Sequence, residues 1–335
     1  MKLKQMALII LAAYGILAVL PVFVGHTPYL MNILIMCLIW AVVASCWDVI
    51  MGFAGIFSFG QVSFFVMGAY CSAILAISHH VPPVFSIVIA GFFTAGMGVL
   101  VGLPCLKLAG PYVALVTFGV HMALQPLLKG EIGIALGSGG AAGLLSIPPI
   151  RLFGYTFGTD NMVPTFYLIL LISLACALTI MGMIKSYWGM AFLALKDSQP
   201  FAASLGISAF KYKLMVFAVT SFLTGIIGAV YGHFYGVLSV RMLDLDLFSI
   251  LMIMILAGGL GHFPGAIIGS FLVVAASEMM APLGVYRAVT MGAMVVVLVL
   301  ALPDGVMGLC RTADQPVPEG IEGAGFKKGW MATEF

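Results

Sequence analysis

Ten runs of strongly apolar residues, most of them long enough to cross a membrane as a helix, constrain this chain more than any other feature. A membrane-crossing helix needs about 20 consecutive, mostly apolar residues. The expected helices lie at roughly 6–24, 28–51, 61–79, 84–103, 111–128, 164–184, 212–236, 247–260, 264–281 and 287–303. The eighth run is short, which favours a broken or re-entrant element. The sequence therefore predicts an all-α polytopic membrane protein with about ten transmembrane helices.

Composition agrees with this prediction. Of 335 residues, 63% are apolar and only 8% are charged, whereas soluble domains carry about 25% charged residues. The net charge of +2 gives no reason to expect nucleic-acid binding. The six cysteines show no CxxC spacing, so neither a disulfide framework nor a zinc site is expected. His79 and His80 have no matching ligand set in the sequence, and we expect no metal site.

The positions of the basic residues predict the orientation, because Lys and Arg are enriched in cytoplasmic loops. With the N-terminus inside, ten basic residues fall on the cytoplasmic side: Lys2, Lys4, Lys107, Lys185, Lys196, Lys211, Lys213, Arg311, Lys327 and Lys328. Four fall outside: Lys129, Arg151, Arg241 and Arg287. We therefore expect both termini in the cytoplasm, with residues 311–335 forming a disordered cytoplasmic tail.

The stretch from Lys185 to Lys213 is the longest polar interruption that still reads as folded structure. Its pattern predicts two short helices with a kink near Asp197. Ser198 can cap the second helix, with Pro200 in its first turn, and Gly206 is the residue type that commonly ends a helix. Two readings stay open: a cytoplasmic helix pair that a motor subunit grips, or a loop that merely connects two membrane helices.

Three glycine-rich interruptions could line a path or only allow close packing. The first, residues 52–65, holds Gly52, Gly55 and Gly60 together with the candidate path residues Ser58, Gln61 and Ser63. The second, residues 108–119, adds Tyr112 and Thr117 as candidates. The third, residues 256–270, predicts a sharp cytoplasmic turn from Gly258 to Pro264, with Gly259 and Gly261 inside it, followed by a small-residue face at Gly265 and Gly269.

The outer loop at 129–163 is the longest and is rich in glycine around residues 137–145. It is either a plain flexible loop or a surface that meets an external partner or lines the outer mouth of a path.

Catalytic chemistry is not expected from this chain. A P-loop requires a Gly-Lys pair, and no such pair occurs anywhere in the sequence. A nucleophile elbow and an HExxH helix are absent as well. Charges at mid-membrane depth would mark an ion-coupled carrier, yet Asp48 and Glu278 fall near the ends of expected helices, and His121 reads as a packed polar group. We expect no catalytic residues and no cofactor bound by the chain.

Together these motifs resemble the LivH/LivM family of permease subunits from bacterial ABC importers for branched-chain amino acids, and the LivM side is the closer match. The resemblance runs from about Trp47 to Leu309. It is carried by Gly52, Gly55, Ser58 and Gly60, leading to Gly68, Ala69 and Tyr70; by Gly110, Tyr112, Ala114 and Thr117; by Ser138, Gly139, Gly140 and Gly143; by Trp188 and Gly189; by Asp197, Ala202, Ala203, Leu205, Gly206 and Ile207; by Gly258 to Gly261; and by Pro303 and Gly305.

The resemblance implies that residues 1–310 form a transmembrane permease domain in a bacterial inner membrane. It also implies a second, LivH-type permease subunit, two cytoplasmic ATPase subunits that use ATP and Mg²⁺, and a periplasmic substrate-binding protein. The implied ATPase-coupling residues are Trp188, Gly189, Lys196, Asp197, Ala202, Ala203, Leu205 and Gly206. The cargo would be a branched-chain or similar small apolar amino acid.

The sequence departs from the family pattern at the coupling stretch. Met190 and Ala191 stand where relatives usually carry basic residues, and Gln199 stands where they carry an acidic one. Ser138 replaces a threonine in the outer loop. Other readings therefore stay open: an ATP-independent carrier or channel for small neutral solutes, a permease for urea or short amides, or a scaffold for a partner permease.

Overall fold

The computed structural model describes residues 3–25, 27–105, 108, 110–152, 154–286, 289–294, 296 and 305–312. The first half of the chain forms α1 (Leu3–Val24), α2 (Pro28–Asp48), η1 (Val49–Phe53), α3 (Gln61–Ser78), α4 (Pro83–Cys105), α5 (Pro111–Lys129), α6 (Glu131–Ala135), η2 (Gly140–Ala142), β1 (Ile150–Leu152) and β2 (Tyr155–Phe157). The second half forms α7 (Met162–Lys185), α8 (Tyr187–Asp197), α9 (Gln199–Ser204), α10 (Ala209–Tyr235), η3 (Val240–Leu243), α11 (Leu245–Gly258), α12 (Gly265–Met279), η4 (Ala281–Tyr286) and α14 (Gly305–Thr312).

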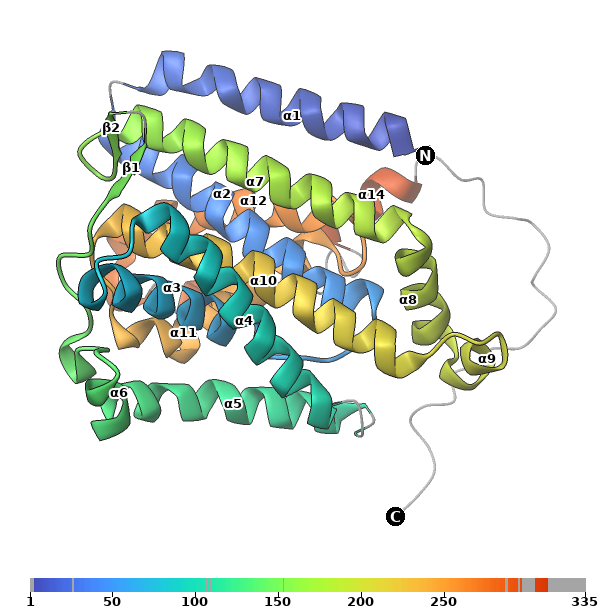
Figure 1. Cartoon of the computed structure of the whole chain (residues 1–335). Coiled ribbons are helices and arrows are strands. Elements are labelled where there is room, and N and C mark those ends of the chain that lie inside the picture. The colour runs from blue at the N-terminus through green and yellow to red at the C-terminus, as the bar shows by residue number, and fades with distance from the viewer. Residues whose placement is uncertain are drawn as a thin grey trace.

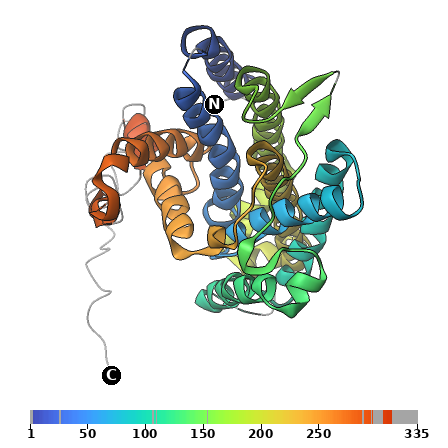
Figure 2. The ribbon, with the colours of Figure 1, turned by 90° about the vertical axis from the view of Figure 1, so that its left-hand side faces the viewer.

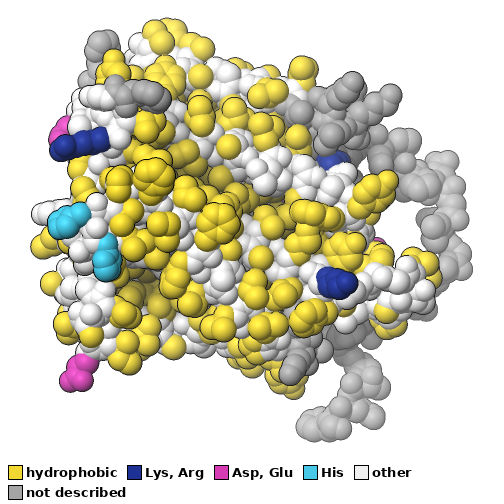
Figure 3. Space-filling view, viewed as in Figure 1, with side chains coloured by type: hydrophobic (Ala, Val, Ile, Leu, Met, Phe, Trp, Pro, Cys, Tyr) yellow, Lys and Arg dark blue, Asp and Glu magenta, His cyan; other side chains and the backbone are white. Residues whose placement is uncertain are grey.

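The long helices run between two ends of the molecule (Figure 1). The start of α1, the α8–α9 pair and α14 lie at one end, and α6 with the β1–β2 hairpin lies at the other. Figure 2 looks onto that second end. Apolar side chains cover the middle of the face in Figure 3, while most of the basic, acidic and histidine side chains in view lie toward its two ends. This distribution suits a surface whose middle faces lipid.

Six helices in the described ranges are long and apolar enough to cross a membrane, and three shorter apolar helices accompany them. The chain is thus an all-α polytopic membrane protein, as predicted. Helices occupy nine of the ten expected runs to within a few residues. Most of the tenth run, 287–303, lies outside the described residues. All of the expected tail beyond Thr312 lies outside them as well.

The first glycine-rich interruption is a real break in helical structure. After Asp48 the helix widens into the π-helical turn η1, and the chain then continues without regular structure from Ala54 to Gly60, the interrupted segment. Its backbone amides find partners inside the protein: Ala54 donates to the Val49 carbonyl and Ile56 to the Ile50 carbonyl, both at 3.0 Å. Internal hydrogen bonds of this kind are what allow non-helical backbone at membrane depth.

Small residues let α10 pack closely between α3 and α4. A side chain at Gly68 of α3 would overlap the backbone of Gly225 on α10, and one at Gly228 would overlap the Phe65 carbonyl. Gly98 of α4 lies equally close to Ser221. Close backbone approach through small residues is the usual means by which helices associate in membranes, and here it forms the central layer of the bundle.

The outer loop is attached to this layer rather than standing free. Leu144 pairs with Leu238 as an isolated β-bridge, and Ser138 donates to the Leu128 carbonyl at 2.7 Å. The buried His233 ring, at the end of α10, contacts the Pro148 carbonyl at 2.7 Å and the Ser72 hydroxyl at 2.8 Å. These contacts join the loop to α5 and to the end of α10, and both readings of the loop stay predictions.

Candidate functional site

The predicted helix pair is confirmed as α8 and α9, with the break after Asp197. The Ser198 hydroxyl accepts from the Phe201 amide, so it caps α9 as expected, and Pro200 lies in the first turn. Gly206 takes a left-handed conformation with φ of +80°. The Ile207 amide donates to the Ala202 carbonyl and the Gly206 amide to the Ala203 carbonyl, which is the Schellman pattern of a helix end.

The helix pair has a buried side and an apolar exposed side. Phe192, Leu195 and Ala202 are buried against the rest of the chain. The exposed side carries large apolar residues: Tyr187, Trp188, Met190, Leu193, Phe201 and Leu205. An exposed apolar patch of this kind, at an end of the molecule where polar groups gather, is typical of a surface that binds another protein.

The implied coupling residues therefore divide into two groups. Trp188, Leu205 and the exposed Ala203 and Asp197 are available to a partner. Gly189 is buried, and a side chain there would overlap the Ile184 backbone. Ala202 is also buried. Gly189 and Ala202 thus shape the pair instead of touching a partner, and Gly206, in open space, ends α9.

Lys196 is exposed and also contacts its own chain, and its predicted role in ATPase coupling stays a prediction. Its Nζ donates to the backbone carbonyl of Gly52, in η1, at 2.6 Å. Gly55, with φ of +66°, lies against the same side chain. A Cβ atom added to Gly55 would lie 2.8 Å from Lys196 Cγ. The hydrogen bond joins α8 directly to the π-helical turn that starts the interrupted segment.

A second contact joins that turn to the third glycine-rich interruption. Asp48, buried in the last turn of α2, accepts from the Gly261 amide at 2.7 Å through Oδ1. Its other oxygen, Oδ2, has no hydrogen-bond partner within the described ranges. Asp48 and Lys196 thus hold three segments together, which we call the coupling junction: the end of α8, η1, and the turn at 259–264.

Glycines make the coupling junction possible because backbone meets backbone there. A side chain on Gly52 would overlap the Gly261 amide and the Asp48 carboxylate. Gly259 and Gly261 both have positive φ, a conformation that suits glycine.

The predicted tight contact at Gly265 and Gly269 is also confirmed, since side chains there would overlap backbone atoms of α11. At Gly60, in contrast, an added Cβ atom would be at ordinary van der Waals distance from its neighbours.

Four of the five candidate path residues come together around the interrupted segment. Ser58 accepts from the Trp47 indole through its carbonyl at 2.6 Å, and the Phe59 amide donates to Thr117 of α5 at 2.8 Å. Ser63 contacts His121 at 3.0 Å. Gln61 bonds Thr224 on α10. All of these side chains are buried.

Tyr112 differs from the other candidates, because it is 63% exposed at the start of α5. Phe59, which the sequence did not single out, lies at the centre instead. Its ring packs edge-on against Trp47, Phe118 and Phe248, with centroid distances of 6.5, 6.4 and 5.4 Å. The aromatic cluster holds the interrupted segment between α2, α5 and α11, and the proposed path role of the polar residues stays a prediction.

Residues 29–302 match the family described as the branched-chain amino acid transport system permease component. The chain belongs to this family. As a family member it is a permease component of a branched-chain amino acid transport system and a multi-pass membrane protein, which agrees with the absence of catalytic motifs in its sequence.

Curated relatives point the same way. The chain is 25% identical to the high-affinity branched-chain amino acid transport system permease protein LivM of Salmonella typhimurium, over 92% of this chain and 76% of that protein. It is 25% identical to LivM of Escherichia coli, over 79% of this chain and 66% of that protein. No solved structure matches the chain significantly.

Proposed function

We propose that this permease is a LivM-type subunit of an ATP-driven importer in a bacterial inner membrane. It would pass branched-chain or similar small apolar amino acids from the periplasm to the cytoplasm. The observation that carries the proposal is the coupling junction. The Lys196 contact to Gly52 links an exposed apolar helix pair, where a motor could bind, to the interrupted segment between the membrane helices.

The motor would be supplied by other chains. Two ATPase subunits binding ATP and Mg²⁺ would grip the exposed side of α8 and α9, and a LivH-type subunit would form the other half of the membrane part. A periplasmic binding protein would deliver the amino acid at the opposite end. Movement of α8 would reach the interrupted segment through Lys196, and the turn at 259–264 through Asp48.

The proposal is tested by reconstituting the chain in vesicles with its candidate permease partner, the ATPase subunits and the binding protein. We expect uptake of labelled leucine and ATPase activity that rises when binding protein and leucine are added. Uptake that continues without the ATPases or ATP would instead identify a carrier or channel. Uptake of urea or acetamide without leucine would assign the system to short amides.

The orientation gives a prediction of its own. In the described ranges, the end of α7, α8 and the start of α10, which hold Lys185, Lys196, Lys211 and Lys213, lie toward the α8–α9 end, while the end of α5 and β1, which hold Lys129 and Arg151, lie toward the opposite end. Because basic residues favour the cytoplasmic side, we expect a Ser198→Cys variant in a cysteine-free background to resist an impermeant thiol reagent added to intact spheroplasts. It should react once the membrane is opened.

A matched control is Leu136→Cys, at an exposed position in the outer loop. This cysteine should react in intact spheroplasts. Reversal of the two labelling patterns would show that the α8–α9 pair faces outward, and the proposed contact with cytoplasmic ATPases would then be wrong.

A further inference from the structure

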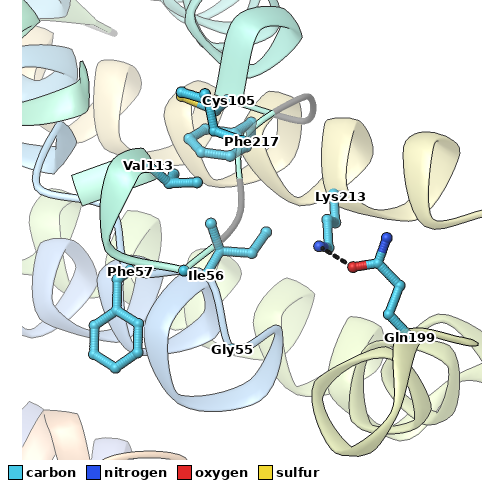
Figure 4. Close-up of a pocket in the computed structure, with 10 residues that line it drawn as sticks. Gly55, Ile56, Phe57, Cys105, Val113, Gln199, Lys213 and Phe217 are labelled. Carbon is cyan, nitrogen blue, oxygen red and sulfur yellow. Dashed lines mark hydrogen bonds between the residues drawn. The ribbon is translucent and has the colours of Figure 1, made fainter. Parts of the chain in front are cut away.

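A cavity of about 270 Å³ lies where the interrupted segment, the end of α4, the start of α5, α9 and the start of α10 meet (Figure 4). It is separate from the coupling junction, because neither Lys196 nor Asp48 lines it within the described residues. Phe57, which is part of its wall, is 56% exposed, so the cavity reaches the surface of the chain. Pockets for drug-sized ligands begin at about 300 Å³, and this cavity therefore suits a smaller group.

Lys213 gives the cavity a positive charge. It is the one charged residue among the described residues in the lining. Its ammonium donates to the Gln199 side-chain oxygen at 3.0 Å, and Figure 4 shows these two side chains facing one another at one side of the cavity. An ammonium has three donors, so one bond to a neutral amide leaves capacity for an anionic acceptor.

The start of α5 favours an anion as well. Gly110 and Val113, at the first turn of this helix, line the cavity. Gly110 is the N-cap residue and makes no side-chain hydrogen bond to the first-turn amides. The amides at a helix start and the positive end of the helix dipole attract anions, phosphate groups among them. Lys213 and the start of α5 thus come from different parts of the chain and favour the same kind of ligand.

The cavity lies at the ends of membrane helices rather than at mid-depth. Its lining includes the last residue of α4, the first turn of α5 and the first turns of α10, and all three helices are long and apolar enough to cross a membrane. Exposed apolar side chains begin within two residues of the lining, at Leu103 on α4 and at Tyr112 and Leu115 on α5. A group bound in the cavity would therefore lie beside the lipid headgroups, with acyl chains against the neighbouring helix surfaces.

We infer that this cavity binds the phosphate of an anionic phospholipid, such as phosphatidylglycerol. The phosphate lies against Lys213 and the first turn of α5, and the acyl chains lie along the exposed sides of α4 and α5. Phosphatidylethanolamine fits less well, because no carboxylate among the described lining residues pairs with its ammonium. Basic pockets between membrane helices bind anionic headgroups by the same chemistry.

Native mass spectrometry on the delipidated full chain in detergent micelles tests the inference. The probes are dioleoyl-phosphatidylglycerol, dioleoyl-phosphatidylethanolamine and glycerol 3-phosphate, which carries the phosphate without acyl chains. We expect phosphatidylglycerol to bind at least about tenfold more tightly than phosphatidylethanolamine. Glycerol 3-phosphate at the same concentration should not displace the lipid, because it has no acyl chains to remove from water. Displacement at equal concentration would identify a site for soluble phosphates and would overturn the lipid assignment.

Two variants place the lipid phosphate in this cavity rather than elsewhere on the membrane surface of the chain. Lys213→Gln should weaken phosphatidylglycerol binding at least about tenfold, because a charge-assisted hydrogen bond is lost. Lys213→Arg, which keeps the charge, should retain binding. Lys211→Gln is the matched control, since Lys211 is exposed on the same helix and does not line the cavity. It should bind the lipid as the wild-type chain does.

Phosphatidylglycerol binding that Lys213→Gln leaves unchanged would contradict the inference, because the lipid would then lie elsewhere. Equal affinity of the wild-type chain for the two phospholipids would contradict it too, since the positive charge of the cavity would then select nothing. Neither result would affect the proposed function, which is measured by ATP-dependent uptake in vesicles. Size-exclusion profiles of the variants check that each is folded.

Discussion

Replacing Gly52 by alanine should abolish transport and lower the stability of the chain. The added methyl group would overlap the Gly261 amide and would lie 2.6 Å from its Cα. Both neighbours are backbone atoms, so they cannot rotate away as a side chain would. Overpacking of this kind costs about 1–3 kcal/mol, and it would force η1 away from the turn at 259–264.

The expected readout for Gly52→Ala is a fall of about 5 °C in the apparent melting temperature of the detergent-solubilised chain. Uptake of leucine by the reconstituted system should fall below a tenth of the wild-type rate. Gly96→Ala is the matched control, because Gly96 lies inside α4 and has no atom within 4 Å of an added Cβ. It should be neutral or slightly stabilising, since alanine favours helix over glycine.

A Gly52→Ala variant with wild-type melting and uptake would show that the contact between η1 and the turn is not tight in the working protein. The coupling junction would then lose its structural basis.

Replacing Lys196 by methionine should disconnect ATP hydrolysis from transport. Methionine keeps the bulk of the side chain but cannot donate to the Gly52 carbonyl, and it removes the positive charge near Asp48. A hydrogen bond from a charged group is worth about 1.5–3 kcal/mol. Its loss therefore changes the equilibrium constant of the contact by a factor of about ten or more. Uptake should fall by at least about tenfold while ATP hydrolysis and subunit assembly persist.

Lys185→Met is the control for Lys196→Met, because Lys185 is exposed at the end of α7 and lies near the same helix pair. It should transport normally. Loss of ATPase binding in Lys196→Met, seen as failure to co-purify the ATPases, would mean that Lys196 contacts the motor directly, and the inward role described above would be wrong.

Much of the fold was predictable because its signals are local. A membrane helix is recognised by about 20 apolar residues in a row, and the observed helices begin and end within a few residues of the expected runs. The ends of α9 were predictable for the same reason. Ser198 and Gly206 act on backbone groups only three to five residues away, so their residue types are informative without any knowledge of the fold.

The coupling junction was not predictable in this way. Lys196 and Gly52 are 144 positions apart, and Asp48 and Gly261 are 213 apart. Nothing in the sequence indicates that these residues meet. From the sequence, Lys196 was therefore interpreted as a charged residue that contacts a partner subunit. Asp48 was interpreted as a residue near the end of a membrane helix. Phe59 was missed because one phenylalanine among 24 carries no signal until its neighbours are known.

The sequence by itself determined that this chain crosses a membrane many times, that a pair of short helices lies between two of the spans, and that glycine-rich interruptions separate others. These properties depend on apolar length and on residue types within a few positions of each other. Only the tertiary structure decided that the helix pair is tied to one of those breaks through Lys196, and that break to another through Asp48. Contacts between distant segments are set by how the helices pack, and that packing depends on the whole chain at once.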